Sequence, residues 1–376
     1  MKKTASFILF SIFITVISAC NPSANETAVH ESSMGSSDLP IVVVNISRSS
    51  TIEIQSTALN QDLTYSSIPV DNATVLQGQP AVDSENNLYI PYGSQDNYLA
   101  KLGPDGSVMT IEIDTEWHYN SQWVGDKFLI IPHSPNEMYL IDLDLTIETI
   151  PNSLAYLDDE HKFGYLGLSN ASPREAIWSF STPLRNEEGD FALYRTFNID
   201  TGKITEFQME VPSTVKDYIP NPENEDEKMG LIVYGIDNAN QNALICYAMF
   251  PNGAFQTTLE LYDGDTGTVI TKEVRCCLNN KFNLEGEAIV EDSAFESCCV
   301  PGVRNWIDYE PTFSYASLLR SDDGSIISFI PFSDAWLIAT EARIIVVDTQ
   351  NHDYPSYDLP DDIKHQMYYA ARYLSN

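Results

Sequence analysis

The stretch from residue 87 to residue 106, NLYIPYGSQDNYLAKLGPDG, contains two short apolar runs that are set apart by turn-forming residues. The first run, 88–90, follows a polar turn, and the second, 99–102, ends in Gly103-Pro104-Asp105-Gly106. Asp can hydrogen bond the turning backbone and Gly accepts a positive φ, so Asp-Gly is typical of tight hairpin turns. The stretch therefore predicts short β-strands joined by tight turns.

Both patterns of this stretch recur along the chain: an apolar run after a polar turn, here called the first half, and an apolar run that ends in an acidic turn, the second half. The copies are 127–131 (KFLII) and 176–180 (AIWSF) for the first half, and 139–144 (YLIDLD), 196–202 (TFNIDTG), 259–267 (LELYDGDTG) and 344–349 (IIVVDT) for the second. Many short strands punctuated by turns predict an all-β fold, as a sandwich, a barrel or a propeller. The one exception we expect is the segment 362–373, DIKHQMYYAARY, which could form a short helix.

The spacing of the acidic turns favours a propeller. Asp105, Asp144, Asp200 and Asp265 are roughly 40 to 65 residues apart, and a propeller blade of four strands takes about 40 to 50 residues. This rhythm, with its Asp-Thr-Gly turns, resembles the blades of quinoprotein-like and related periplasmic propellers, although a Trp-Asp repeat ending is missing. Dividing the folded residues 41–376 by this blade size predicts about six or seven blades. Two β-sandwich or β-barrel domains are the alternative.

Residues 1–20, MKKTASFILFSIFITVISAC, form a second informative stretch. Lys2 and Lys3 precede an uncharged apolar segment that is too short for a membrane-spanning helix of about 20 residues. The ending Ile-Ser-Ala-Cys at 17–20 resembles the lipobox of bacterial lipoproteins. The resemblance implies that residues 1–19 are a signal peptide and that Cys20 carries the lipid, including palmitate-like acyl chains. An ordinary secretory signal is the alternative.

The residues after Cys20 indicate how the body is held. Residues 20–40 are rich in Ser, Asn and Ala and poor in large apolar side chains, which predicts a flexible linker. Asn21 stands where Gram-negative lipoproteins retained at the inner membrane usually have Asp. The expected location is therefore extracytoplasmic, anchored to the cell membrane or, in a Gram-negative organism, to the outer membrane.

The net charge of −34, from 54 acidic and 20 basic residues, makes this an acidic protein. Such a surface repels phosphate backbones, so we expect no nucleic-acid partner. It could attract divalent cations or cationic partners, or it could serve solubility in a salty environment. A hydrophobic content of 43% is enough for a packed core and argues against disorder.

Four cysteines form two adjacent pairs, Cys276-Cys277 and Cys298-Cys299. An oxidising compartment favours disulfides, with three possible connectivities, and these would staple an acidic insertion near 276–299. Zinc or redox chemistry is the alternative, but both usually use Cys-x-x-Cys spacing. Cys246 lies in an apolar run and is expected to be a buried free thiol.

No catalytic motif or dinucleotide fingerprint occurs, so the sequence predicts no cofactor and favours a protein without enzymatic activity. The run 263–267, DGDTG, resembles half of a calcium loop, but Val274 stands at the twelfth place, so Ca²⁺ stays a weak alternative to a hairpin turn. Arg304, Trp306 and Asp308 mix stacking and hydrogen-bonding groups and could form a ligand groove.

These patterns together predict a lipid-anchored binding or scaffold protein of the bacterial cell envelope. The expected partners are the membrane, through the lipid, and an envelope protein or a glycan. Two alternatives remain. One is a polysaccharide hydrolase or lyase that uses opposed carboxylates. The other is a subunit of an envelope protein complex.

Overall fold

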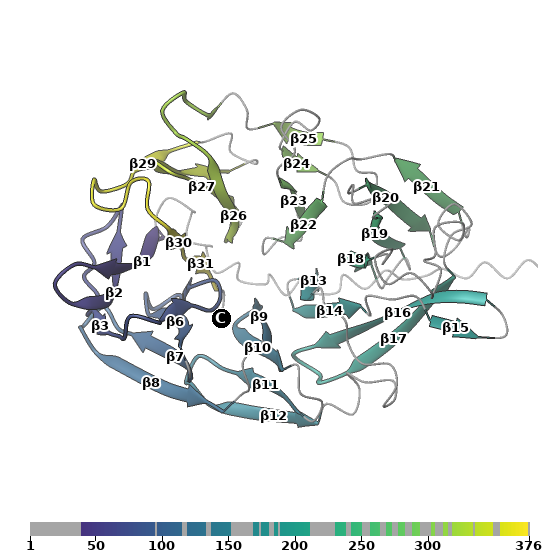
Figure 1. The fold of residues 1–376 in the computed structure, drawn as a ribbon, viewed down its shortest axis with the longest axis horizontal. Coiled ribbons are helices and arrows are strands. Elements are labelled where there is room, and N and C mark those ends of the chain that lie inside the picture. The colour runs from purple at the N-terminus through teal and green to yellow at the C-terminus, as the bar shows by residue number, and fades with distance from the viewer. Residues whose placement is uncertain are drawn as a thin grey trace, which may run out of the picture.

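The structure is a computed structural model that describes residues 39–374 with gaps, of which those of four or more residues are 115–118, 133–136, 152–167, 180–183, 211–229, 238–241, 250–255, 264–267, 273–276, 283–287, 294–301, 305–310 and 349–353. Within the described residues, 31 strands and no helix are found, and the strands form seven sheets. Figure 1 shows the sheets arranged as a ring around a central axis. This architecture is a β-propeller with one sheet per blade, which confirms the all-β propeller prediction and fixes the blade number at seven.

The seven sheets are numbered here in chain order. The first contains β1 (Val42–Arg48), β2 (Ile52–Ala58), β3 (Ile68–Pro69) and β30 (Tyr368–Ala370). The second contains β4 (Val75–Leu76), β5 (Ala81–Val82), β6 (Leu88–Gly93), β7 (Asn97–Leu102), β8 (Val108–Ile113) and β31 (Arg372–Tyr373). The third contains β9 (Tyr119–Val124), β10 (Lys127–Pro132), β11 (Glu137–Ile141) and β12 (Ile147–Pro151).

In the remaining four sheets all paired strands are antiparallel. The fourth contains β13 (Leu168–Ser172), β14 (Glu175–Ser179), β15 (Leu184–Asn186), β16 (Gly189–Asn198) and β17 (Ile204–Glu210). The fifth contains β18 (Gly230–Asp237), β19 (Asn242–Met249), β20 (Gln256–Asp263) and β21 (Thr268–Lys272). The sixth contains β22 (Cys277–Phe282), β23 (Ala288–Ser293), β24 (Gly302–Arg304) and β25 (Pro311–Ser314), and the seventh β26 (Ile326–Phe332), β27 (Ala335–Thr340), β28 (Arg343–Val347) and β29 (Ser356–Asp358).

The ring is closed by the C-terminal segment 368–374. Strand β30 pairs antiparallel with β1, and β31 pairs parallel with β5, so one short segment joins the first sheet to the second. Its amides complete the joint, because Ala371 N donates to Val42 O at 2.8 Å and Leu374 N donates to Val82 O at 2.8 Å.

The helix expected over 362–373 is therefore wrong. Residues 361–366 form turns, and the rest of the segment is extended. Several residues of this segment favour a helix locally, but pairing with β1 and β5 buries Tyr368, Ala370 and Leu374 almost completely. Tertiary pairing of this kind routinely outweighs local propensity.

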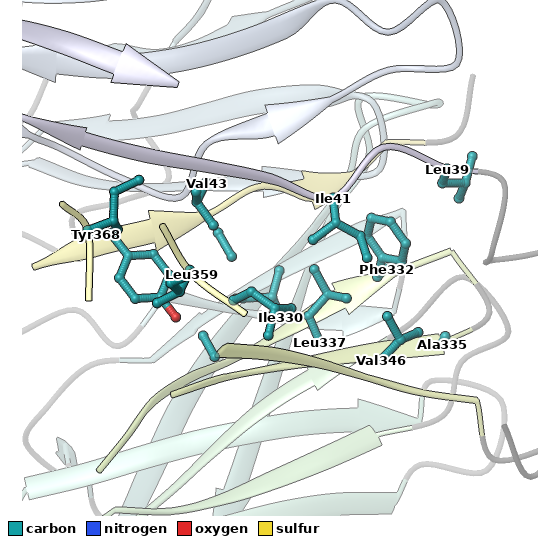
Figure 2. Close-up of a cluster of buried hydrophobic side chains, with 14 residues drawn as sticks. Leu39, Ile41, Val43, Ile330, Phe332, Ala335, Leu337, Val346, Leu359 and Tyr368 are labelled. Atoms are coloured by element: carbon teal, nitrogen blue, oxygen red, sulfur yellow. The ribbon is translucent and has the colours of Figure 1, made fainter. Parts of the chain in front are cut away.

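The core is distributed in layers between neighbouring sheets instead of lying at one centre. Figure 2 shows the layer between the first and seventh sheets, where Ile41 and Val43 face Ile330 and Leu337, with Tyr368 at one end. Leu39, which the sequence places in the linker, is 2% exposed and belongs to this layer. The described body thus begins to pack at Leu39.

Layered packing explains why several strands are continuously apolar. Strands β6 and β27 are buried at every position, because each lies in a sheet that is covered on both faces. The layer between the second and third sheets shows this clearly: Tyr89 packs edge to face on Trp123, with ring centroids 5.7 Å apart, and Phe128 lies against Trp123.

The predicted acidic turns are present where the side chains are described. Between β7 and β8, Ser107 N donates to Asp105 Oδ1 at 2.9 Å, and Gly106 has φ +85°. Between β11 and β12 the hydrogen-bonding role falls to Asp142, whose Oδ1 accepts from Asp144 N and Thr146 N. Asp side chains therefore fix these two hairpin turns, whereas in the copy at 196–202 the side chain of Asn198 takes this role. Over the described part of the chain, no helix is present that could cross a membrane.

Candidate functional site

The strands nearest the axis of the ring form an inner rim, and a cluster of side chains lies on it where the second and third sheets meet. There β31 lies beside β5, while β9 is the edge strand of the third sheet on the side of the axis (Figure 1). Side chains alternate along β31, so Arg372 and Leu374 share one face. Leu374 packs in the layer between the second and third sheets, which places Arg372 on the side facing β9.

Arg372 is the central residue of this inner rim. It is 8% exposed, and its Nη1 donates to Trp123 O on β9 at 3.0 Å. Its backbone N donates to Pro80 O at 2.9 Å. The guanidinium Nε is buried and has no hydrogen-bond acceptor, and among the described residues no carboxylate forms an ion pair with Arg372.

Burial changes the titration of this side chain. Desolvation lowers the pKa of Arg372 from the usual 12.5 to about 10. A group with this pKa is still protonated at neutral pH. The inner rim therefore holds a buried positive charge that nothing in the described part of the chain neutralises.

The surroundings of Arg372 are fixed by hydrogen bonds between the two sheets. Trp123 Nε1 donates to Gln79 O at 2.8 Å, and Ser121 Oγ donates to Gln77 O at 3.1 Å. The side-chain amide of Gln79 in turn donates to Ala370 O. Because these contacts tie β9 and the C-terminal segment to residues 77–79, the guanidinium is held on a rigid frame.

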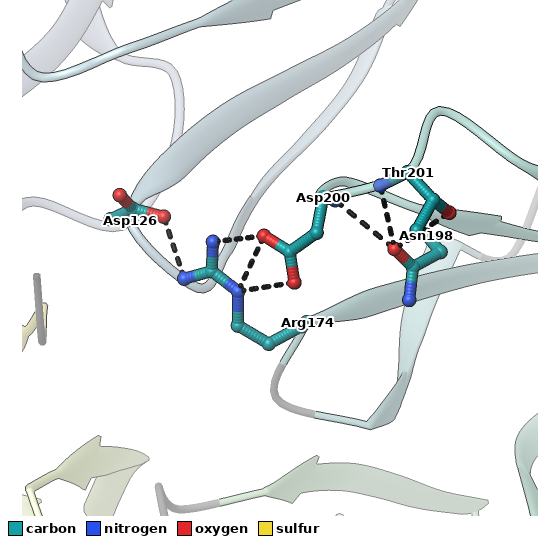
Figure 3. A network of polar contacts seen from close by, with 5 residues as sticks. All are labelled: Asp126, Arg174, Asn198, Asp200 and Thr201. Carbon is teal, nitrogen blue, oxygen red and sulfur yellow. Dashed lines mark hydrogen bonds and ion pairs between the residues drawn. The ribbon is translucent and has the colours of Figure 1, made fainter.

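A second polar cluster joins the third and fourth sheets (Figure 3). Arg174 Nη1 donates to Asp126 at 2.7 Å, and its Nε and Nη2 donate to the carboxylate of Asp200. Asn198 shapes the neighbouring turn, since its side-chain oxygen accepts from the amides of Asp200 and Thr201. The hydrogen bonds from Arg174 lower the pKa of Asp200. Both carboxylates contact the one guanidinium, so each charged group has a partner of opposite sign and the cluster acts as a joint between blades.

A third cluster is buried between the second and third sheets. The Tyr89 hydroxyl lies 2.8 Å from Asp83 Oδ2 and 3.0 Å from Leu143 O. Lys101 Nζ donates to Leu143 O at 2.9 Å and lies over the Tyr89 ring. Burial, followed by the hydrogen bond to Asp83, raises the pKa of Tyr89. A phenol with a raised pKa stays neutral, so this cluster also fits a structural role.

No protein-family model and no curated protein matches this chain. Among solved structures, it is similar to apo AztD from Citrobacter koseri, with 10% identity over 89% of this chain and 98% of that chain and a TM-score of 0.43. It is also similar to the β-propeller domain of the Trilobed protease from Pyrococcus furiosus, with 9% identity, coverage of 77% and 85%, and a TM-score of 0.43. A third similar structure is virginiamycin B lyase from Staphylococcus aureus, with 10% identity over 76% of this chain and 87% of that chain and a TM-score of 0.38. At these identities and scores, none carries an argument about the ligand or the activity of this chain.

Most of the residues predicted for a site lie outside the described residues. These are Cys20, Cys276, Cys298, Cys299, Trp306 and Asp308. Only the backbone positions of Cys277 and Arg304 are described, at the start of β22 and at the end of β24. The disulfide, the lipid attachment and the ligand groove therefore stay predictions.

The segment between the two cysteine pairs contributes to a blade. Residues 277–282 and 288–293 form the hairpin β22–β23 of the sixth sheet, with Cys277 opposite Ser293 at its open end. The cysteine pairs thus flank a hairpin of the ring. The possible calcium loop, which starts at Asp263, is described only in part. Asp263 ends β20, but residues 264–267 and 273–276 are not described. Within the described residues, no three metal-ligating side chains come together.

Arg372 was not singled out from the sequence, although one signal was present. It stands in the run 367–374, MYYAARYL, where it is the only charged residue among apolar ones. A lone charge in an apolar run points to burial if the run is part of the core. Its place at the rim depends on pairing with β5, which is distant in the sequence.

Proposed function

We propose that this protein is a lipid-anchored, extracytoplasmic β-propeller that binds a ligand or partner at the bacterial cell envelope. The observation that carries the proposal is the segment 1–20, whose lipobox-like ending at Cys20 is followed by a polar linker. The structure adds support at the other end of that linker, because the described body starts to pack at Leu39. A tether of this length would let a folded propeller stand off a membrane surface.

Binding is favoured over catalysis by what the inner rim offers. A ring of sheets gives a rigid frame whose rim and loops can carry recognition groups. The rim holds a fixed and uncompensated guanidinium, which is suited to recognising an anionic group. Among the described side chains, Arg372 is not paired with a nucleophile or a general base, so its surroundings fit ligand binding better than catalysis. The partner is expected to be an envelope protein or a glycan.

Replacing the lipidated cysteine tests the anchor directly. Cys20→Ser should move the protein from the membrane fraction to the soluble fraction and abolish incorporation of a clickable fatty acid. Cys246→Ser is the matched control, because it removes a thiol from β19 and leaves the signal segment intact. The control should remain in the membrane fraction with its label. Membrane retention and labelling of Cys20→Ser would contradict the proposal.

A further inference from the structure

Three arginines of this chain can be compared by what their guanidinium groups contact. Arg343 directs Nε and Nη2 at the two oxygens of Asp323, at 2.5 and 2.8 Å. Arg174 directs the same two nitrogens at Asp200. In both, the edge formed by Nε and Nη2 is occupied by a carboxylate in the two-point geometry that a planar guanidinium favours.

Arg372 presents the same edge without an acceptor. Its Nη1 is taken by Trp123 O, but Nε is buried without a partner, and no acceptor for Nη2 is found among the described residues. Arg372 is as thoroughly enclosed as Arg343, since the two are 8% and 4% exposed. The difference between them is therefore the missing carboxylate and not the degree of burial.

We propose that the Nε–Nη2 edge of Arg372, at the inner rim of the ring, binds the carboxylate of a small ligand. The inference deepens the proposed binding function, on which it rests, by naming the chemical class of the ligand. A carboxylate fits because its two oxygens match the spacing of the two nitrogens. A halide ion can accept from both nitrogens, but only at a single point, so it matches the two-point geometry of this edge less well than a carboxylate does.

Energetics support a ligand role for this charge. Removing a guanidinium from water without a compensating anion is unfavourable, and buried polar groups are otherwise almost always satisfied. A purely structural residue at this position would be better as an apolar side chain. The pKa of about 10 leaves the side chain charged at neutral pH, so the charge is available to a ligand.

Because Nε is closed to solvent in this structure, a carboxylate can reach the edge only if neighbouring side chains move, which limits the size of the group. Trp123 and Leu374 pack in the layer on the same side of β31. We therefore expect a small acid such as formate or acetate to bind, or a carboxylate at the tip of a larger molecule. Formate is the probe of choice because it presents the bare functional group.

The test measures thermal unfolding of the full processed chain in non-ionic detergent while sodium formate replaces sodium chloride at constant ionic strength. The transition temperature of the wild type should rise by about 2 °C at a formate concentration about ten times the dissociation constant. Arg372→Met should show no formate-dependent shift. Arg48→Met, which removes an exposed arginine, should respond like the wild type. This readout does not depend on the anchor, so it can fail while the membrane fractionation succeeds.

A second variant keeps the test decisive if Arg372→Met does not fold. Arg372→Lys retains the charge without the planar two-point edge, so its formate response should shift to about tenfold higher concentration. In ¹⁵N-arginine-labelled wild type, the Arg372 Nε–H resonance should move on adding formate and not on adding chloride. A wild type that ignores formate, equal shifts in wild type and Arg372→Met, or equal responses to formate and chloride would each overturn the proposal.

Discussion

The ion pair between Asp323 and Arg343 offers the sharpest prediction for stability. Both side chains are almost fully buried, at 3% and 5% exposed, and two charge-assisted hydrogen bonds join them. Asp323 also accepts from Arg320 N, and Arg343 Nη2 also donates to Leu318 O. The pair therefore ties the segment before β26 to the first residue of β28.

Asp323→Asn keeps an acceptor for Arg320 N but leaves the Arg343 charge without a counterion. Breaking a buried pair on one side lowers the free energy of unfolding by about 3 to 5 kcal/mol. With a urea m value of about 3 kcal/mol/M for a chain of this size, the unfolding midpoint should fall by about 1 M or more. Circular dichroism of the sheets and tryptophan fluorescence would follow the transition.

A double-mutant cycle separates the pair from its neighbours. Arg343→Met alone should also cost about 3 to 5 kcal/mol, because it leaves the Asp323 carboxylate buried. The double variant should be more stable than the sum of the single effects predicts, by at least about 2 kcal/mol. Asp361→Asn is the matched control, since Asp361 is fully exposed in its pair with Lys364, and its effect should stay below about 0.5 kcal/mol.

The pH dependence provides an independent check of the same pair. The hydrogen bond from Arg343 lowers the pKa of Asp323 below its value in the unfolded chain. A lowered folded-state pKa gives stability that is present above the unfolded pKa of about 3.9 and is lost as the pH falls through the folded value. The difference in the free energy of unfolding between the wild type and Asp323→Asn should therefore become smaller as the pH is lowered. The reasoning would be refuted if each single substitution lowered the free energy of unfolding by less than about 1 kcal/mol, if the two losses added, and if the loss in Asp323→Asn stayed the same in acid.

Three further substitutions probe other parts of the ring. Leu374→Ala removes a fully buried side chain of the inner rim and should lower the free energy of unfolding by about 2 to 5 kcal/mol, measured by urea titration; a change below about 1 kcal/mol would mean that the segment does not pack there. Tyr368→Phe removes the hydrogen bond to Thr340 O at 2.7 Å and should cost about 1 kcal/mol in the same assay, so an unchanged midpoint would argue against that bond. Asp126→Asn weakens the partly exposed contact with Arg174 and should cost less than about 1 kcal/mol, with a smaller effect at high salt; a large, salt-independent loss would contradict the exposure of this joint.

Local signals in the sequence predicted most of the strands and turns. The apolar runs at 88–90 and 127–131 lie in β6 and β10, and the turn at Asp105 has the expected backbone and side-chain contacts. These features depend on a few neighbouring residues, so a single sequence contains them. The repeat spacing then limited the blade number, because each blade needs a similar length of chain.

The closure of the ring and the inner rim could not be predicted in the same way. Val44 and Tyr369 are direct partners across β1 and β30, although nearly the whole described chain separates them in sequence. No local pattern encodes such a pairing, so local patterning alone predicts a helix over 362–373 where the structure has turns and short strands. The burial of Arg372 is equally hard to predict, because it depends on the pairing of β31 with β5, which is distant in the sequence.

Amide hydrogen exchange over residues 368–374 tests most directly the central claim that the C-terminal segment closes the ring. The amides of Ala371, Arg372 and Leu374 donate to Val42, Pro80 and Val82, so each should be strongly protected. In the full chain, their exchange should be as slow as that of the buried strand β27. Exchange of these three amides at the rate of a frayed terminus, while β27 stays protected, would contradict the closure and the inner rim built on it.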